Sequence, residues 1–531
     1  MLTAITAPTI SRPDPIAEST IMHRSITTSA PGKLILFGEH AVVHGKAAVA
    51  AGLGLRTAVK INEYNVESSH DSLEHDDSIG DQGGLVQVDR DTIRFSTKDV
   101  QDLDVKWSIQ EVKDLSLLID VRLEECGKPL AADIEHITQF VHDTIGGESV
   151  CPTALVAAAV FLYLYICTGS CSKHTAAQTQ PNNNTSTERN TDVRTEIDTH
   201  PNTDISANID LVRDNTRCRK MRVMHAHVKS QLPIGAGLGS SAAFSVALAA
   251  AMLASGGQIR NLCSMDMEHE IEDDTKDVKI VDSNTRNSQD NDCGETGDKK
   301  LANEMQSEPA IIAWSSEEQE IINVWAFAAE CIIHGLPSGI DNTVSCYGSA
   351  IRFQRGAPMQ NVDMPKLKIY LTNTMVPRST KLLVAEVRRR RDLLPSVVDP
   401  ILIAVENISL KALDILQTLL KVNATAVVSQ LFSELECLVD LNQGLLQSVG
   451  VGHPSISNVV EITRQLGFHT KLTGAGGGGC TMTLIPSGTD GAAIAQMNSA
   501  LRAEGYDVWE TTVGGSGVVQ HSSDPDWLHI L

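Results

Sequence analysis

The residues best suited to chemistry in this chain lie in and around three glycine-rich segments that are far apart in the sequence. The segments are SAPGK at 29–33 with its continuation GEHAVVHG at 38–45, LPIGAGLGSSA at 232–242, and KLTGAGGGGC at 471–480. Glycine lets the backbone approach a ligand closely. Any one segment alone is a weak signal, because glycine also marks ordinary turns, so the neighbouring residues must decide the chemistry.

The second segment has the order strand, glycine loop, helix, and the free N–H groups at such a helix start attract anions. Ser240 and Ser241 stand at the predicted helix start, where a hydroxyl either caps the helix or binds a magnesium ion that accompanies a phosphate. The loop is not a Walker A motif, because the GxxxxGK[ST] lysine is missing. A phosphate-binding cation must come from elsewhere, and Lys33 is the natural candidate, although an exposed strand lysine is the alternative.

A third group of chemical residues is ECIIHGLPSGIDN at 330–342, which places two carboxylates near a helix end and the following turn. Phosphoryl transfer needs one carboxylate to ligate magnesium and another to accept a proton. Glu330 and Asp341 could divide the work in this way. The alternative is that Glu330 is a surface helix residue and Asp341 a turn or cap residue.

These residues must be positioned by strands and helices that the hydrophobic pattern predicts. Strands are expected at 29–37, 47–51, 53–63, 222–229, 367–371 and 480–485. Helices are expected at 241–254, 317–333, 380–391 and 400–420. Gly335 is a suitable residue to end the helix at 317–333. Strands and helices are interleaved, which indicates an α+β fold.

The chain also contains long polar stretches that cannot build a core. We expect an N-terminal extension at 1–26 and insertions at 172–217 and 256–309 to be disordered, with a shorter polar loop at 68–84. These insertions interrupt an N-terminal domain at 27–362, which a C-terminal domain at 363–531 follows.

Composition excludes several classes of partner. The net charge of −23 and an aromatic content of 4% disfavour nucleic acid. The longest apolar run, 154–167, is shorter than the roughly 20 residues that a bilayer needs, so we expect a buried core helix and no membrane partner. The 11 cysteines form no CxxC pair and no zinc-ligand pattern, and the N-terminus lacks the apolar segment of a secretory signal. Reduced thiols and a cytoplasmic location are expected.

In this order, the three glycine segments resemble the signature motifs of the GHMP small-molecule kinases, and within that superfamily the mevalonate kinases. The matching stretches are SAPGKLILFGEHAVVHG at 29–45, LPIGAGLGSSAAFSV at 232–246, GLPSGIDNTVS at 335–345, LTNTMVPRST at 371–380 and KLTGAGGGGC at 471–480. The similarity runs discontinuously from about residue 27 to 522. Galactokinases differ by an arginine after the first glycine, and homoserine kinases lack the GEHAVVHG continuation.

The resemblance implies ATP-dependent phosphorylation of the 5-hydroxyl of mevalonate with Mg²⁺, an early step of isoprenoid and sterol precursor synthesis. By motif position, Asp341 is the expected catalytic base, and Lys33 would pair with it, contact ATP and favour the developing alkoxide. Ser241 and Glu330 are the expected magnesium ligands. The residues expected to cradle the ATP phosphates are Gly235, Ala236, Gly237, Leu238, Gly239, Ser240 and Ser241.

Further expectations rest on the same resemblance. Ser230 would contact the nucleotide, and Glu39, His40 and Thr380 would lie on the mevalonate side. The glycine run at 474–479 would approach the phosphates or the substrate from the second domain. Between 66 and 150 the resemblance is poor, so no adenine-contacting residue is assigned there.

For the whole protein, the resemblance implies a ribosomal-protein-like α+β N-terminal domain and a ferredoxin-like C-terminal domain with the active site in the cleft between them. It also implies a homodimer and inhibition by prenyl diphosphates that compete with ATP. Two rivals remain open: another GHMP kinase such as phosphomevalonate kinase, and a catalytically dead sensor on the same fold. A dead copy would be expected to lose Lys33, Glu330 or Asp341, and all three are present.

Overall fold

A computed structural model describes residues 21–65, 91–120, 122–124, 126–147, 150–168, 221–260 and 311–528. The polar loop expected at 68–84, the insertion expected at 172–217, and most of the other insertion and of the N-terminal extension lie outside these ranges. Several expected boundaries are wrong, two of them in the first strand and in the helix after the second glycine segment. The first strand begins at Ile21, since Ile26 is buried against Ile61, and the helix expected to end at 254 continues to Gly256.

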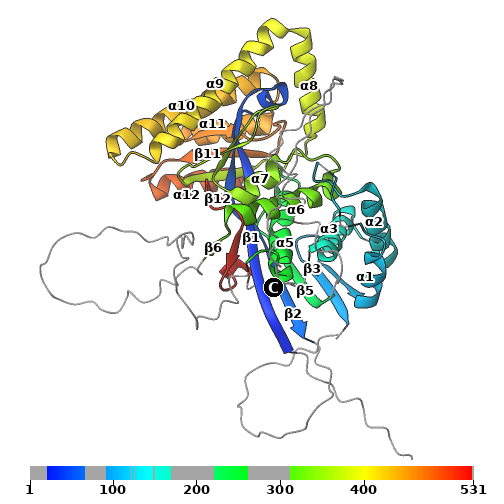
Figure 1. The fold of residues 1–531 in the computed structure, drawn as a ribbon. Helices are drawn as coiled ribbons and strands as arrows, with labels where there is room; N and C mark the ends of the chain where they lie inside the picture. Colours follow the sequence, from blue (N-terminus) through cyan, green and yellow to red (C-terminus); the bar gives the residue numbers. More distant parts are fainter. Residues whose placement is uncertain are drawn as a thin grey trace, which may run out of the picture.

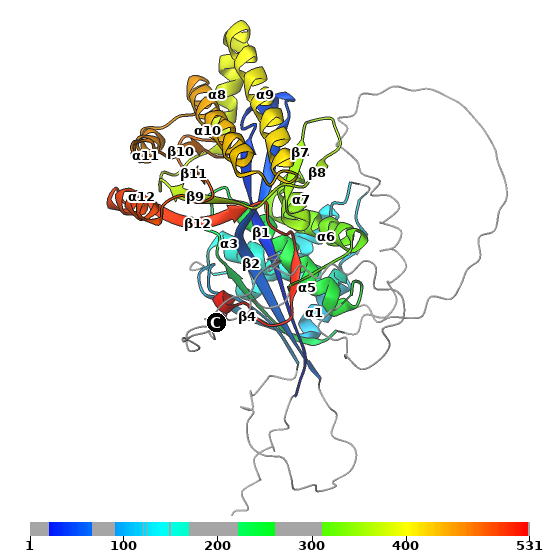
Figure 2. The same cartoon turned by 90° about the vertical axis from the view of Figure 1, so that its left-hand side faces the viewer.

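Two long strands form the spine of the molecule. β1 (Ile21–Phe37) and β2 (Ala48–Asn65) are antiparallel over nearly their whole length and are joined through the short 3-10 helix η1 (Ala41–His44). They run from one end of the molecule to the other (Figures 1 and 2). The two strands expected at 47–51 and 53–63 are therefore one, because Gly52 and Gly54 sit within the strand instead of turning it.

The remaining N-terminal strands extend this hairpin into a sheet. β5 (Val223–Ser230) pairs with β2, β3 (Thr92–Thr97) lies parallel to β5, and β4 (Leu103–Ser108) is antiparallel to β3. The inward side chains of β3 and β4 alternate with exposed ones, as expected for a sheet with one buried face. Beyond these, β7 (Ala350–Phe353) pairs with β2, and β8 (Gln360–Val362) pairs with β7.

Helices cover the buried face of this sheet. They are α1 (Ile109–Ser116), α2 (Ala131–Ile145), α3 (Pro152–Thr168), α5 (Ser240–Gly256), α6 (Ser316–His334) and α7 (Ile340–Tyr347). The apolar run expected to form a buried helix does so in α3, whose Phe161 stacks on Phe95 of the sheet with ring centroids 4.8 Å apart. None of the helices in the described ranges is long and apolar enough to cross a membrane.

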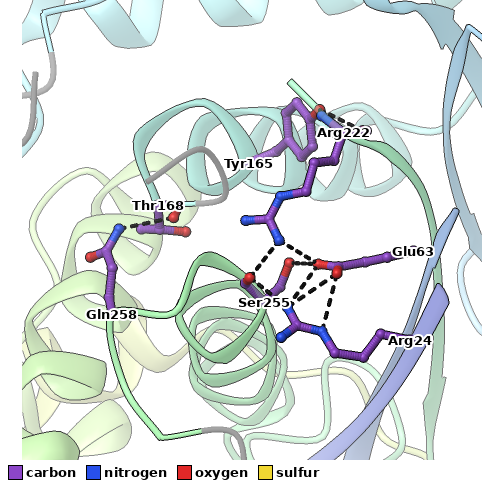
Figure 3. Close-up of polar contacts among 7 residues, drawn as sticks. All are labelled: Arg24, Glu63, Tyr165, Thr168, Arg222, Ser255 and Gln258. Atoms are coloured by element: carbon purple, nitrogen blue, oxygen red, sulfur yellow. Dashed lines mark hydrogen bonds and ion pairs between the residues drawn. The ribbon is translucent and has the colours of Figure 1, made fainter. Parts of the chain in front are cut away.

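The C-terminal end of α5 is held by a partly buried polar cluster (Figure 3). Arg24 and Arg222 each donate to the carbonyl oxygen of Ser255, at 2.6 and 2.7 Å. The buried carboxylate of Glu63 accepts from both guanidinium groups and from the Ser255 hydroxyl. Cations at a helix C-terminus complement the helix dipole, so the cluster fixes one end of the helix whose other end is the second glycine segment.

The C-terminal half is an antiparallel sheet with helices. Its strands, in the order β10-β11-β9-β12, are β10 (His469–Leu472), β11 (Cys480–Ile485), β9 (Leu367–Asn373) and β12 (Asp507–Val513). Its helices are α8 (Thr380–Leu393), α9 (Pro395–Leu419), α10 (Thr425–Ser448), α11 (Pro454–Gln465) and α12 (Gly491–Ala503). α9 starts before the expected residue 400, because Pro395 occupies its first turn and Pro400 lies inside it.

The last part of the chain does not stay with the C-terminal half. β13 (Val519–His521) pairs with β1 and with β6 (Ile311–Ala313), and the 3-10 helix η4 (Asp526–Leu528) follows it. The expected C-terminal domain at 363–531 is therefore wrong at its end, because the tail completes the N-terminal sheet. The α+β character itself is confirmed.

Candidate active site

A cavity of about 630 Å³ opens where the two halves meet, and residues from all three glycine segments line it. The expected site residues on its wall are Lys33, Glu39, His40, Ser230, Gly235, Gly237, Gly239, Ser240, Ser241, Asp341 and Thr380. Glu330, Ala236 and Leu238 are not part of the wall but contact residues that are. The fold thus brings the expected residues together around one cavity.

The start of α5 is built by glycine at positive φ. Gly239 is the N-cap residue with φ 74°, no side chain caps the helix, and Ser240 and Ser241 are its first two residues. The alternative in which these serines act as helix caps is therefore wrong. A Cβ on Gly239 would lie 2.8 Å from Lys33 Cγ, so glycine is what allows the loop to reach β1. The backbone N–H of Lys33 donates to the Leu238 carbonyl at 2.8 Å, which locks the two segments together.

Lys33 and Asp341 form an ion pair at the cavity wall. Lys33 Nζ lies 3.1 Å from Asp341 Oδ1, and the two side chains are 13% and 37% exposed. Lys33 comes from β1, and Asp341 from the first turn of α7, where Gly339 is the N-cap residue and no side chain caps the helix. Asp341 is thus not a cap residue, and Lys33 is not a solvated strand lysine. A partly exposed carboxylate beside an ammonium group is suited to accepting a proton from a bound hydroxyl.

Glu330 is buried behind Ser241. Its carboxylate accepts hydrogen bonds from Ser245 Oγ at 3.0 Å and from Ser241 Oγ at 3.4 Å. Burial raises the pKa of Glu330 to about 7. His334, one helical turn further along α6, has its Nε2 atom 3.1 Å from Ser241 Oγ and 3.8 Å from Glu330 Oε2. Sequence reasoning missed His334, although its spacing of four residues from Glu330 places both on one face of the helix.

These residues fit a magnesium ion that is shared with a phosphate. Within the described ranges, no group of three or more His, Cys, Asp or Glu side chains is arranged to hold a metal by itself. Mg²⁺ usually takes only one or two protein carboxylates and completes its shell with water and substrate phosphates. Glu330 forms no ion pair with a described Lys or Arg, so a divalent cation would supply the positive charge that this buried carboxylate needs.

Arg378 is the second residue that sequence reasoning missed. Its guanidinium donates to the carbonyl of Ala236 at 3.0 Å and to that of Gly478 at 2.9 Å, and so joins the second glycine segment to the third. It lines the cavity and forms no ion pair with a described residue. A Cβ on Gly479 would lie 1.4 Å from the Arg378 Nη1 atom, so only glycine at this position leaves room for the arginine side chain. Its position could have indicated it, because Arg378 lies two residues before Thr380 in the matching stretch LTNTMVPRST at 371–380.

The expected acceptor-side residues lie together but differ in exposure. Thr380 is the first residue of α8 and faces the cavity. His40 Nε2 donates to the Ala475 carbonyl at 2.8 Å, and burial lowers the pKa of this imidazole. Glu39 touches the cavity wall, yet its carboxylate is buried in an ion pair with Lys471. Of the third glycine run, Gly474 and Ala475 reach the cavity.

Ser230 is another residue of the cavity wall. Its hydroxyl is 2.8 Å from Thr57 Oγ1, and its backbone N–H donates to Asp99 Oδ2 at 2.6 Å. The neighbouring wall is formed by Thr97, Asp99, Val100, Thr153, Val156 and Ala157. Thr97, Asp99 and Val100 come from the stretch between 66 and 150, where the sequence offered no basis for assigning nucleotide contacts.

Comparisons with known proteins agree with this geometry. The model of the GHMP kinases N-terminal domain matches residues 207–276, and that of the GHMP kinases C-terminal domain matches residues 424–503. The chain is 33% identical over 514 residues to the mevalonate kinase of Mus musculus, covering 95% of this chain and 97% of that relative. It is 32% identical over 501 residues to the mevalonate kinase of Homo sapiens, covering 94% and 95%.

The chain belongs to the mevalonate kinase family. It is therefore a kinase, an enzyme that transfers a phosphoryl group. A crystal structure of a mevalonate kinase matches the fold with a TM-score of 0.51 at 15% identity, covering 92% of this chain and 99% of the other. At that identity the likeness bears on the fold alone, and it agrees with the GHMP kinase fold expected from the motifs.

Proposed function

We propose that this chain transfers the γ-phosphoryl group of ATP to the 5-hydroxyl of mevalonate, with Mg²⁺ as its metal cofactor. The product would be 5-phosphomevalonate, formed early in isoprenoid and sterol precursor synthesis. The observation that carries the proposal is the Lys33–Asp341 ion pair in the same cavity as the N-terminus of α5. Membership of the mevalonate kinase family selects the acceptor.

In this proposal, the ATP phosphates lie on the N–H groups at the start of α5, between Gly235 and Ser241. Asp341 accepts the proton of the acceptor hydroxyl while the oxygen of that hydroxyl bonds to the γ-phosphorus. The bond from that phosphorus to the bridging oxygen breaks, and ADP leaves. Lys33 stabilises the negative charge that develops on the attacking oxygen, and the positive guanidinium of Arg378 faces the same cavity.

Ser241 and Glu330 would hold the magnesium ion. When bound, the ion neutralises phosphate charge and orients the phosphates for in-line transfer. Ser230 would contact the nucleotide, and Glu39, His40 and Thr380 would form the acceptor side. A homodimer, competition by prenyl diphosphates for the ATP site and a cytoplasmic location stay predictions that the family resemblance motivates.

The test is a measurement of ADP release by the purified chain with ATP and Mg²⁺. The acceptors to compare are mevalonate, phosphomevalonate, galactose and homoserine, with the site of phosphorylation read by phosphorus NMR. We expect turnover with mevalonate alone and phosphate on its 5-oxygen. Turnover of phosphomevalonate would instead identify a sister GHMP kinase. ATP binding without turnover of any acceptor would identify a sensor on the same fold.

A further inference from the structure

A second lysine–carboxylate pair lies between the two halves of the molecule, away from solvent. Lys471 of β10 pairs with Glu39, which follows β1, and both side chains are 0% exposed. Lys471 Nζ also donates to its neighbouring Leu472 carbonyl at 2.9 Å and lies 5.5 Å from the centre of the Phe37 ring. Asn442 of α10 donates to the other Glu39 oxygen at 3.1 Å. Removing two charges from water is costly, so such a pair is weak evidence for stability alone.

Two further hydrogen bonds connect the same two segments. Thr473 Oγ1 donates to the Ile35 carbonyl at 3.0 Å, and His40 Nε2 donates to the Ala475 carbonyl at 2.8 Å. His40 has φ 61°, a conformation that non-glycine residues adopt only when the surroundings impose it. The end of β1 with the residues that follow it and the start of the third glycine run are therefore fixed to each other at three points.

These fixed segments form one wall of the active-site cavity. His40 and Ala475 line it, together with Gly474 and Thr380, whereas Lys471 does not reach the cavity. Any effect of Lys471 on the reaction must therefore pass through the residues that it holds. Lys33 lies on the same strand β1, so the wall and the Lys33–Asp341 pair share one support.

We propose that Lys471 is a positioning residue: paired with Glu39, it locks the third glycine run onto the end of β1 and thereby shapes the binding site of the phosphoryl acceptor. This inference rests on the proposed function, because it assigns this wall to the acceptor. In this proposal, Glu39 holds the acceptor side of the cavity in place by pairing with Lys471, and its carboxylate does not contact the substrate.

The test uses Lys471→Met in the full chain, with Lys411→Met as the matched control. Lys411 also pairs with a glutamate of another helix, Glu434, but its side chain is half exposed. Kinetics are measured well below the thermal midpoint of each variant. We expect KM for mevalonate to rise at least ~10-fold in Lys471→Met while KM for ATP stays within about threefold, because small misplacements of a substrate are costly. The control should match the wild type.

Two further measurements keep the inference falsifiable. Hydrogen exchange should become faster at Gly474–Gly477 in Lys471→Met, which is independent of activity. The double variant Glu39→Gln with Lys471→Met removes the uncompensated charge but still lacks the pair. Its thermal midpoint should move back toward wild type, whereas KM for mevalonate should stay raised and exchange at Gly474–Gly477 should stay fast. The double variant also replaces the single variant if that does not fold.

The inference fails if the thermal midpoint of Lys471→Met falls but KM for mevalonate is unchanged, which would make the pair purely structural. It also fails if the double variant regains the wild-type KM for mevalonate, since the defect of Lys471→Met would then come from the uncompensated Glu39 charge. A raised KM with wild-type exchange at Gly474–Gly477 would overturn it too, since Glu39 would then act on the substrate by its own charge. A wild-type chain without mevalonate turnover would instead sink the proposed function. The two failures are therefore distinguishable.

Discussion

Asp341 and Lys33 are the residues whose contact defines the proposed chemistry. The 3.1 Å separation lets the ammonium group hold the carboxylate in place while leaving it partly open to the cavity. Asp341→Asn keeps the shape of the side chain but removes its ability to accept a proton. We expect kcat to fall by at least about 10², the usual minimum for losing a general base, with ATP affinity retained.

The kcat of this variant can be compared with that of Asp363→Asn, which neutralises an exposed carboxylate. Nucleotide affinity is measured separately by calorimetry. Near-normal turnover by Asp341→Asn would show that another group takes the proton.

Glu330 makes a separate prediction about the metal. The buried carboxylate has no lysine or arginine ion pair in the described part of the chain, and Ser241 already contacts it. Glu330→Gln should lower kcat and raise the Mg²⁺ concentration needed for half-maximal rate, because a hard cation prefers a charged oxygen ligand. Ser241→Ala should act in the same direction.

The measurement is a magnesium titration of rate and, separately, of Mg²⁺-dependent nucleotide binding. Glu317→Gln, an exposed residue in the first turn of the same helix, is the control. Unchanged titrations in both active-site variants would rule out these ligands.

On the scale of elements, the start of α5 depends on how closely the second glycine loop approaches β1. Gly235 and Gly239 have nearly the same φ, 75° and 74°, but only Gly239 lies against Lys33. Alanine at either position should cost roughly 1 to 2 kcal/mol of stability for the left-handed conformation. Gly239→Ala should in addition displace Lys33 and lower kcat by at least ~10-fold, as a misplaced catalytic group does.

Because Gly235→Ala carries the same backbone strain with no atom within 4 Å of its Cβ, the difference between the two variants isolates the contact with Lys33. Stability is measured by chemical denaturation and kcat by ADP release. Equal kcat values in the two variants would show that the close approach is not needed for turnover.

At the scale of the whole molecule, the returning tail makes stability depend on pH. His521 of β13 is buried, and its Nε2 atom lies 2.7 Å from Ser29 Oγ of β1. That hydroxyl accepts from Arg56 Nε at 2.8 Å, and its own hydrogen can be donated to the ring nitrogen of an unprotonated His521. Burial, together with the nearby Arg56 charge, lowers the pKa of His521 to about 4. The unfolded chain takes up this proton near pH 6.5, so folded stability falls as pH drops from about 6.5 toward 4.

We therefore expect His521→Gln to lose less stability than wild type between pH 7 and pH 5, by roughly 1 to 2 kcal/mol. The measurement is the free energy of unfolding from denaturant titrations at the two pH values. His136→Gln, which changes an exposed histidine, should leave the pH dependence as it is in wild type. Parallel pH profiles for wild type and His521→Gln would contradict the assignment.

The sequence by itself determined the local features. Hydrophobic periodicity is set by neighbouring residues, so it located the helices that became α5, α6 and α8, and the strand that became β11, to within a few residues. The glycine segments and their neighbours also supplied the residues of the candidate site, from Lys33 to Asp341. The sequence did not reveal that β1 begins at Ile21, because the polar residues around 24–29 conceal a strand that only its pairing with β2 stabilises.

The tertiary structure alone decided which distant residues meet. No sequence pattern places Lys471 against Glu39, Arg378 between two glycine loops, or His521 beside Ser29, because each contact joins elements from separate parts of the chain. The same holds for Ser240 and Ser241: their type permits helix capping, and only the fold, with Gly239 as N-cap and Glu330 behind Ser241, excludes it. Side-chain type and spacing limit what a residue can do, whereas burial and partners, which depend on the packed whole, determine what it does.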